Sequence, residues 1–171
     1  AMILAAQVLL VVAASAARTS ADPISPIPRR LPPAGIKLND DERSRLEQRL
    51  SQVQDRYARH AQHALAPDVE IFLTAVKLAL RHDEFYGERD AASALDLLNT
   101  ASDRLSALEA GKTPWADARG PIARGYRSAI DGSVQPYGLV IPDGLDMSEP
   151  VPLYVWLHGR GDKSTNLSFV L

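Results

Sequence analysis

Residues 151–162 read VPLYVWLHGRGD, and this stretch decides the fold that we expect for the second half of the chain. Its short continuous apolar run, LYVWL at 153–157, is typical of a strand buried on both faces of a parallel or mixed sheet. The run leads directly into His158, Gly159, Arg160 and Gly161. Two glycines around one residue let the backbone turn sharply and expose its N–H groups, and an oxyanion hole requires such preset donors.

A β-hairpin is expected just upstream of this stretch. Residues 125–130 read GYRSAI, residues 134–142 read VQPYGLVIP, and a turn at Asp131 and Gly132 separates them. Pro136 has no N–H to donate, so we expect it to face away from the strand ladder, at an edge or a bulge. The sequence therefore predicts three strands between residues 125 and 157.

These segments together resemble the opening of the catalytic domain in prolyl-oligopeptidase-like and related esterases of the α/β-hydrolase superfamily. In those proteins a strand–turn–strand with an Asp-Gly turn and a Gln-Pro-Tyr precedes a strand that ends in His-Gly-x-Gly. The resemblance covers about residues 124–169. It implies a serine hydrolase, either a carboxylesterase or a peptidase, that cleaves an ester or peptide substrate by acyl transfer through a serine ester.

The resemblance also implies roles for the residues of the glycine loop. Arg160 would offer its backbone N–H to the oxyanion, Gly159 and Gly161 would permit the turn, and His158 would be structural rather than the triad histidine. In the family the serine, the acid and the histidine follow in that order, and no G-x-S-x-G occurs in this chain. We therefore expect the amino-terminal part of a hydrolase, with a truncated sheet, that is inactive alone because it lacks the nucleophile.

Two alternatives to this interpretation remain at the level of sequence. The chain could be a secreted helical interaction module without catalytic activity, whose β segment is only a support. It could also be a complete small protein that ends in a short β-ribbon. A downstream G-x-S-x-G would separate the hydrolase from both.

Three amphipathic helices are predicted between residues 39 and 112. The first is capped by Asn39 or Asp40 and extends to about Ala64, the second begins near Pro67, and the third begins near Glu88 and stops at Gly111. Their apolar stripes have helical spacing. The stripes comprise Leu46, Leu50, Val53 and Tyr57, then Val69, Phe72, Leu73, Val76 and Leu80, and finally Leu95, Leu98, Ala101, Leu105 and Leu108.

The amino-terminal region has the pattern of a secretory signal. Residues 2–17 form an apolar run that is too short for a comfortable membrane span and is followed by small residues suited to cleavage. Proline-rich residues 22–33 then predict an extended tether. We expect an exported protein, secreted or periplasmic, without stable membrane insertion after signal cleavage. An uncleaved anchor or a buried helix is the alternative reading of the apolar run.

Composition excludes several function classes. The formal charge of −2 and the pI of about 6.1 argue against nucleic-acid binding. The chain has no cysteine, and His60, His63 and His82 have no companion metal-ligand pattern, so no metal or cofactor is expected. Trp115 and Trp156 are expected to be packing residues, with a sugar platform as the alternative for Trp115. The oligomeric state is left open.

The predicted fold class is α+β, a three-helix amino-terminal bundle followed by the first strands of a truncated α/β-hydrolase sheet. Four segments are expected: a signal peptide at 1–21, a proline-rich linker at 22–38, a helical domain at 39–112, and the hydrolase part at 113–171.

Overall fold

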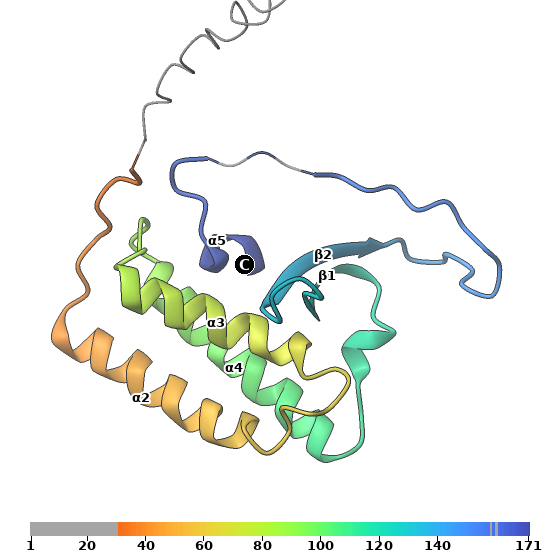
Figure 1. The fold of residues 1–171 in the computed structure, drawn as a ribbon, viewed down its shortest axis with the longest axis horizontal. Coiled ribbons are helices and arrows are strands. Elements are labelled where there is room, and N and C mark those ends of the chain that lie inside the picture. Colours follow the sequence, from red (N-terminus) through yellow and green to blue (C-terminus); the bar gives the residue numbers. More distant parts are fainter. Residues whose placement is uncertain (1–30, 158, 160) are drawn as a thin grey trace, which may run out of the picture. The chain divides into compact units, whose positions relative to one another are not determined.

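The computed structural model of the chain describes residues 31–157, 159 and 161–171, and it divides the chain into two units, residues 1–31 and residues 32–171. All the helices and strands described below belong to the second unit (Figure 1). The predicted signal peptide and most of the linker lie outside the described residues. Residues on both sides of the expected boundary at Lys112 belong to the same unit.

Three long helices form the bundle that the sequence predicts (Figure 1). They are α2 (Asp40–Tyr57), α3 (Pro67–His82) and α4 (Asp90–Glu109). Asn39 caps α2 through a capping box, because its side chain accepts from the Glu42 N–H at 2.8 Å while the Glu42 carboxylate accepts from the Asn39 N–H at 3.2 Å. Pro67 occupies the first turn of α3, as predicted.

Helix α2 ends at Tyr57 rather than near Ala64, so the predicted end was too late. The apolar stripe stops at Tyr57, and residues 58–64 read ARHAQHA, with no large apolar side chain to hold another helical turn against the bundle. The backbone tightens there, since Arg59 and His60 donate to carbonyls three residues back instead of four.

The predicted stripes lie in the interior of the bundle: all their members are buried except Tyr57 and Leu95, which pack against it half-buried. The interior also contains Ile71, Phe85 and Leu97, which the sequence analysis did not assign to it. Polar side chains join α2 to α4 along its border: Arg49 donates to Asn99 at 3.0 Å, and Arg56 donates to Ser106 at 2.9 Å. The residue numbers of the contacts increase along α2 and α4 in the same direction. The two helices therefore run parallel, as in an up–down–up bundle.

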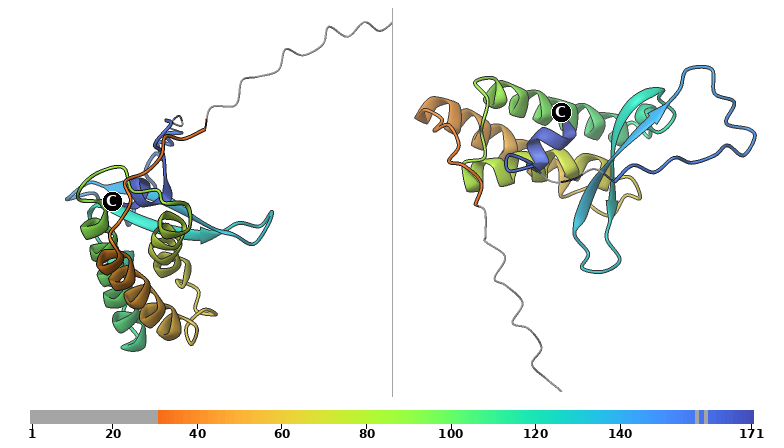
Figure 2. Two further views of the ribbon diagram at one scale, coloured as in Figure 1. Left: turned by 90° about the vertical axis from the view of Figure 1, so that its left-hand side faces the viewer. Right: turned by 90° about the horizontal axis from the view of Figure 1, so that it is seen from above.

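A short connection leads from the bundle to a hairpin. Gly111 ends α4 in the left-handed region, with φ of 67°, as predicted. The single turn η1 (Pro114–Ala116) then places Trp115 in the interior, and strands β1 (Gly120–Arg127) and β2 (Val134–Ile141) pair antiparallel. Figure 2 shows the loop of this hairpin projecting away from the helices.

The hairpin differs from its prediction in length and in its turn. Strand β1 begins at Gly120 rather than Gly125, and a loop of residues 128–133 replaces the expected two-residue turn at Asp131 and Gly132. The reason is local hydrogen bonding: the Ser128 N–H donates to the Ser133 carbonyl at 2.8 Å, and the Asp131 carboxylate accepts from the Ser133 N–H at 3.1 Å.

The third predicted strand, LYVWL at 153–157, is absent, and the expectation that it would be buried was wrong. These residues form neither helix nor strand, and their exposed fractions range from 66% for Val155 to 91% for Leu157. Trp156, which we expected to pack inside, lies in this exposed run. A buried strand needs neighbouring strands for its backbone hydrogen bonds and helices or another sheet over its faces. Within the described part of the chain the one sheet consists of β1 and β2, which pair with each other.

The short helix α5 (Asn166–Val170) completes the described part of the chain. Helix α3 contacts α5, β1 and β2 as well as the other two long helices, so it is the central element of residues 32–171. The α+β class, with three helices followed by strands, is confirmed.

Candidate functional site

The glycine loop lies between the exposed run and α5. Arg160, the predicted oxyanion donor, and His158 lie outside the described residues. Gly159 and Gly161 are described and exposed, and the Gly161 N–H donates to the Ser164 hydroxyl at 2.8 Å. The second glycine of the loop is therefore held by the side chain of Ser164, two residues before α5 begins.

Helix α5 is fixed at its start and along one face. Thr165 caps it, because its hydroxyl accepts from the Ser168 N–H at 3.0 Å while the Thr165 N–H donates to the Ser168 hydroxyl at 3.1 Å. Leu167 and Val170 are buried in the same interior as the long helices. The apolar face of α5 therefore anchors the carboxyl side of the glycine loop on the bundle.

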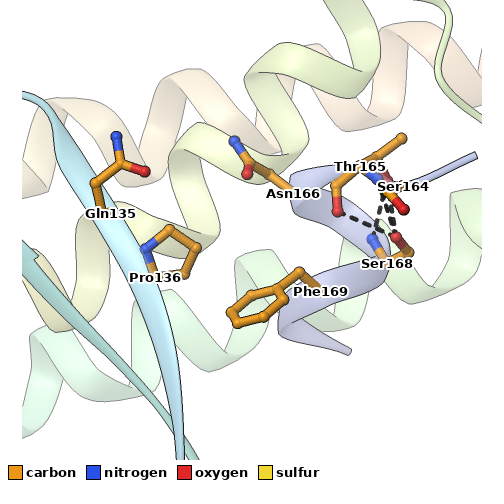
Figure 3. Close-up of a pocket in the computed structure, with 7 residues that line it drawn as sticks. All are labelled: Gln135, Pro136, Ser164, Thr165, Asn166, Ser168 and Phe169. Carbon is orange, nitrogen blue, oxygen red and sulfur yellow. Dashed lines mark hydrogen bonds between the residues drawn. The ribbon is translucent and has the colours of Figure 1, made fainter. Parts of the chain in front are cut away.

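A cavity of about 440 Å³ lies between β2 and α5, beside this loop. Figure 3 shows Pro136 and Phe169 on opposite sides of it, with the amides of Gln135 and Asn166 at one end. Its lining combines hydroxyls, amides, a proline and an aromatic ring: Gln135, Pro136, Ser164, Thr165, Asn166, Ser168 and Phe169. Such a lining suits a neutral group that forms hydrogen bonds at one end and packs against a ring at the other.

A second contact joins the loop to the connection between α3 and α4. The Lys163 ammonium lies 5.9 Å from the centre of the Tyr86 ring, within cation–π range. Tyr86 itself is held in place because its backbone N–H donates to the Asp90 carboxylate at 2.8 Å. Lys163 is exposed, so the contact contributes about 0.5–1 kcal/mol, less than burial of Leu167.

The densest polar cluster lies at the first turn of α3, where Asp68 is only 1% exposed. Its carboxylate accepts from Trp115 Nε1 at 2.9 Å, from Arg124 Nε at 3.0 Å and from the Gly125 backbone N–H at 2.7 Å. A buried carboxylate is stable only when it is paired and hydrogen-bonded, and these three donors meet that requirement. Asp68 thus joins α3, η1 and β1.

Arg104 on α4 completes this cluster. It donates to the Asp68 backbone carbonyl at 2.7 Å and to the Ala123 carbonyl at 3.0 Å, and its guanidinium stacks over the rings of Phe72 and Trp115. Burial lowers the pKa of Arg104 to about 10, against the opposing effect of the Asp68 carboxylate, so the side chain keeps its charge at neutral pH. The cluster therefore carries two arginines and one carboxylate.

Beside the Asp68 cluster, Glu70 links its own helix α3 to α2 and β1. Tyr57 at the end of α2 donates its hydroxyl hydrogen bond to the Glu70 carboxylate, and Arg127 of β1 donates to the same oxygen at 2.8 Å. Burial, and then the Glu70 carboxylate, raise the pKa of the Tyr57 phenol well above its ordinary value. Two acidic residues of α3, Asp68 and Glu70, therefore attach the hairpin to this helix.

Sequence reasoning missed Asp68. An acidic residue directly after Pro67 has the pattern of an ordinary first-turn contact with the helix dipole, which occurs equally at exposed positions. Its partners are 47 to 57 residues further along the chain, so no local pattern reveals them. The one available signal was Trp115, predicted as a packing residue, because a buried indole N–H needs an acceptor.

The described residues were also searched for a metal site and for a membrane-spanning helix. Among them, no group of three or more His, Asp or Glu could hold a metal ion, and no helix is both long and apolar enough to cross a bilayer. Comparison of the chain with models of protein families, with curated proteins and with solved structures finds no match.

Proposed function

We propose that this chain is the amino-terminal part of an exported serine hydrolase, a carboxylesterase or peptidase, that acts by acyl transfer. The observation that carries the proposal is the exposed run at 153–157 followed by the glycine loop and a capped helix. Five consecutive large apolar side chains, each at least 66% exposed, form a surface that normally marks an interaction site. A buried central strand of a larger sheet would account for both their composition and their exposure.

The order of elements supports the same proposal. The hairpin with Gln135, Pro136 and Tyr137 on its second strand comes first, the apolar run and glycine loop follow, and α5 begins five residues after Gly161 (166 − 161 = 5). If the apolar run at 153–157 pairs as a strand of a larger sheet, this succession would put backbone N–H groups at the carboxyl end of that strand, where α/β-hydrolases bind the oxyanion.

The chemistry would proceed by addition and elimination at the carbonyl. A serine Oγ, supplied by sequence that follows Leu171, would attack the carbonyl carbon while a histidine takes its proton. The Arg160 N–H would stabilise the negative oxygen of the tetrahedral intermediate. Return of the proton would release the alcohol or amine, and water would then hydrolyse the acyl enzyme. In this proposal the 171-residue chain would contribute the glycine loop and the helix that follows it, and the nucleophile would come from elsewhere in the protein.

Labelling with a fluorophosphonate tests the proposal. The protein made from the complete reading frame is treated with the probe, and mass spectrometry locates the modified serine. We expect one labelled serine after Leu171, within G-x-S-x-G, and p-nitrophenyl acetate hydrolysis that the probe abolishes. The 171-residue chain alone should give neither. A complete protein that is not labelled and not active would favour a secreted helical interaction module.

A further inference from the structure

The outer edge of strand β2, on the side away from β1, has unused backbone groups. In an antiparallel pair, opposite residues alternate between pairs that exchange two hydrogen bonds and pairs that exchange none. The Gly125 N–H donates to Asp68 and not across the hairpin, so Gly125 and its partner Pro136 form a pair of the second kind. By the same alternation, Gly138 and Val140 also direct their N–H and carbonyl groups away from β1.

The two outer edges of the hairpin differ in what covers them. On the β1 side the helices use the outward groups, since the Gly125 N–H is bound to α3 and the Ala123 carbonyl accepts from Arg104 of α4. On the β2 side, no strand other than β1 pairs with β2 in the described part of the chain. An added Cβ at Gly138 would meet nothing within 4 Å, and Val140 is 76% exposed. This edge is therefore open to another extended chain.

The cavity of about 440 Å³ lies at one end of this open edge. Figure 3 shows α5 beside β2 at Pro136, with the cavity between them. The described residues that line it include no charged side chain. Pro136 and Phe169 supply apolar walls, and the Asn166 amide can both donate and accept a hydrogen bond. The cavity therefore suits one uncharged side chain of a chain that lies along β2.

We propose that β2 binds an extended peptide as an added strand, with one uncharged peptide side chain in the cavity. A peptide backbone repeats donors and acceptors at the spacing of the β2 edge. A tyrosine side chain matches the cavity, because its ring packs against Pro136 and Phe169 while its hydroxyl bonds to an amide. A charged side chain would lose its hydration without gaining a partner of opposite charge. Such binding goes beyond the proposed function and requires no catalysis.

Amide hydrogen exchange of the 171-residue chain, followed by NMR, tests the proposal with the blocked peptide acetyl-Val-Thr-Val-Tyr-amide. Saturating peptide should slow exchange at Gly138 and Val140 by at least about tenfold, because their N–H groups become hydrogen-bonded. Tyr137 and Leu139 direct their N–H groups to β1 and should change by less than about twofold. The same peptide with glutamate in place of tyrosine should bind at least about tenfold more weakly. Absence of binding, or binding that leaves exchange at Gly138 and Val140 unchanged, overturns the proposal.

Two substitutions at Gly138 separate the backbone donor from the added side chain. Gly138→Pro removes the outward N–H, and a strand edge accepts proline at such a position, as it does at Pro136. Its affinity for the tyrosine peptide should fall at least about tenfold, whereas the matched control Gly138→Ala keeps the N–H and should stay within about twofold. Equal affinities of the two variants overturn the proposal. If Gly138→Pro does not fold, the exchange pattern of the wild type decides.

A second copy of the chain is the competing occupant of this edge. Exchange at Gly138 and Val140 is therefore measured without peptide at several protein concentrations. We expect fast exchange that does not depend on concentration. Protection that rises with protein concentration would show that β2 pairs with another copy, and would overturn the proposal.

Discussion

The carboxylate of Asp68 accepts a hydrogen bond from the backbone N–H of Gly125 at 2.7 Å, and thereby joins the first turn of α3 to the middle of strand β1. In the strand register Gly125 is opposite Pro136, which cannot donate a hydrogen bond. Because the Gly125 N–H is directed to Asp68 and not across to β2, the prediction that Pro136 faces away from the ladder agrees with this geometry. The hairpin is therefore joined to the helix at the position where its own ladder has no bond.

Gly125→Ala should destabilise the 171-residue chain strongly. The new Cβ would lie 2.2 Å from the Pro67 carbonyl oxygen, so strand or helix has to move and the Asp68 contact lengthens. We expect a loss of about 1–3 kcal/mol in the free energy of unfolding, measured by urea denaturation. Gly138→Ala is the matched control, since its Cβ would meet nothing within 4 Å, and it should change stability by less than about 0.5 kcal/mol. Equal midpoints for the two variants would show that β1 does not lie against Pro67.

Alkaline pH should destabilise the chain partly through Tyr57. Its pKa is raised in the folded state above the ordinary 10.0, so the folded chain keeps a proton that the unfolded chain loses. The contribution of the protonated Tyr57 side chain to the free energy of unfolding is therefore fully present below about pH 10 and is lost as pH rises further. Between about pH 9 and 11 the wild type should lose stability faster than Tyr57→Phe, by less than about 1.4 kcal/mol per pH unit.

Urea titrations at several pH values measure this difference. Tyr154→Phe is the control, because that ring is 85% exposed and its environment changes little on unfolding. Its pH dependence should match that of the wild type. Parallel curves for wild type and Tyr57→Phe would contradict the raised pKa of Tyr57, and with it the burial of the phenol and its contact with Glu70.

The apolar run should be reachable by solvent in the 171-residue chain and covered in the full-length protein. The chain has no cysteine, so Val155→Cys introduces a single thiol. We expect its maleimide labelling in the 171-residue chain to match the rate in urea, while Val76→Cys, at a buried position, should be protected. In the full-length protein Val155→Cys should react at least about a hundredfold more slowly, equivalent to about 2.7 kcal/mol of opening free energy. Fast labelling there would argue against a central strand.

Backbone and side chain at Arg160 should have different effects in the full-length enzyme. The proposed donor is an N–H, so Arg160→Ala should keep most of kcat on small esters. Arg160→Pro removes the donor, and loss of one such donor costs about a hundred- to a thousandfold in kcat. Proline also restricts Gly159, so melting temperatures are compared first. If Arg160→Ala loses as much rate as Arg160→Pro, the loop is not a backbone oxyanion hole.

The helices could be predicted because their signals are local. The stripe from Leu46 to Tyr57, the proline at residue 67 and the glycine at residue 111 each act within a few residues, and each was confirmed. The end of α2 and the hairpin loop were predicted wrongly because they depend on which neighbouring side chains are buried and which hydrogen bonds the neighbouring residues form. LYVWL shows the limit: apolar content predicts that a segment needs cover, but not whether the described part of the chain provides that cover, and here these residues stay exposed.

The candidate site was less accessible to sequence reasoning than the fold. The glycine loop follows a recognisable pattern, yet the helix after it, α5, is only five residues long, and the partners of Asp68 are distant in sequence. Hydrogen bonds between residues 57 positions apart, such as that from Gly125 to Asp68, arise from packing of whole elements. No spacing rule in the sequence predicts them.

The parallel contacts between α2 and α4 have a geometric consequence. Arg49 bonds to Asn99 and Arg56 to Ser106, so the two contacts are seven residues apart on both helices (56 − 49 = 7 and 106 − 99 = 7). One added residue rotates a helix by about 100° and lengthens it by about 1.5 Å. An insertion between the contacts on one helix would therefore turn one contact away from its partner. Between the two contacts α2 and α4 have the same number of residues. An insertion or deletion in this part of one helix therefore has to be matched by the same change in the other.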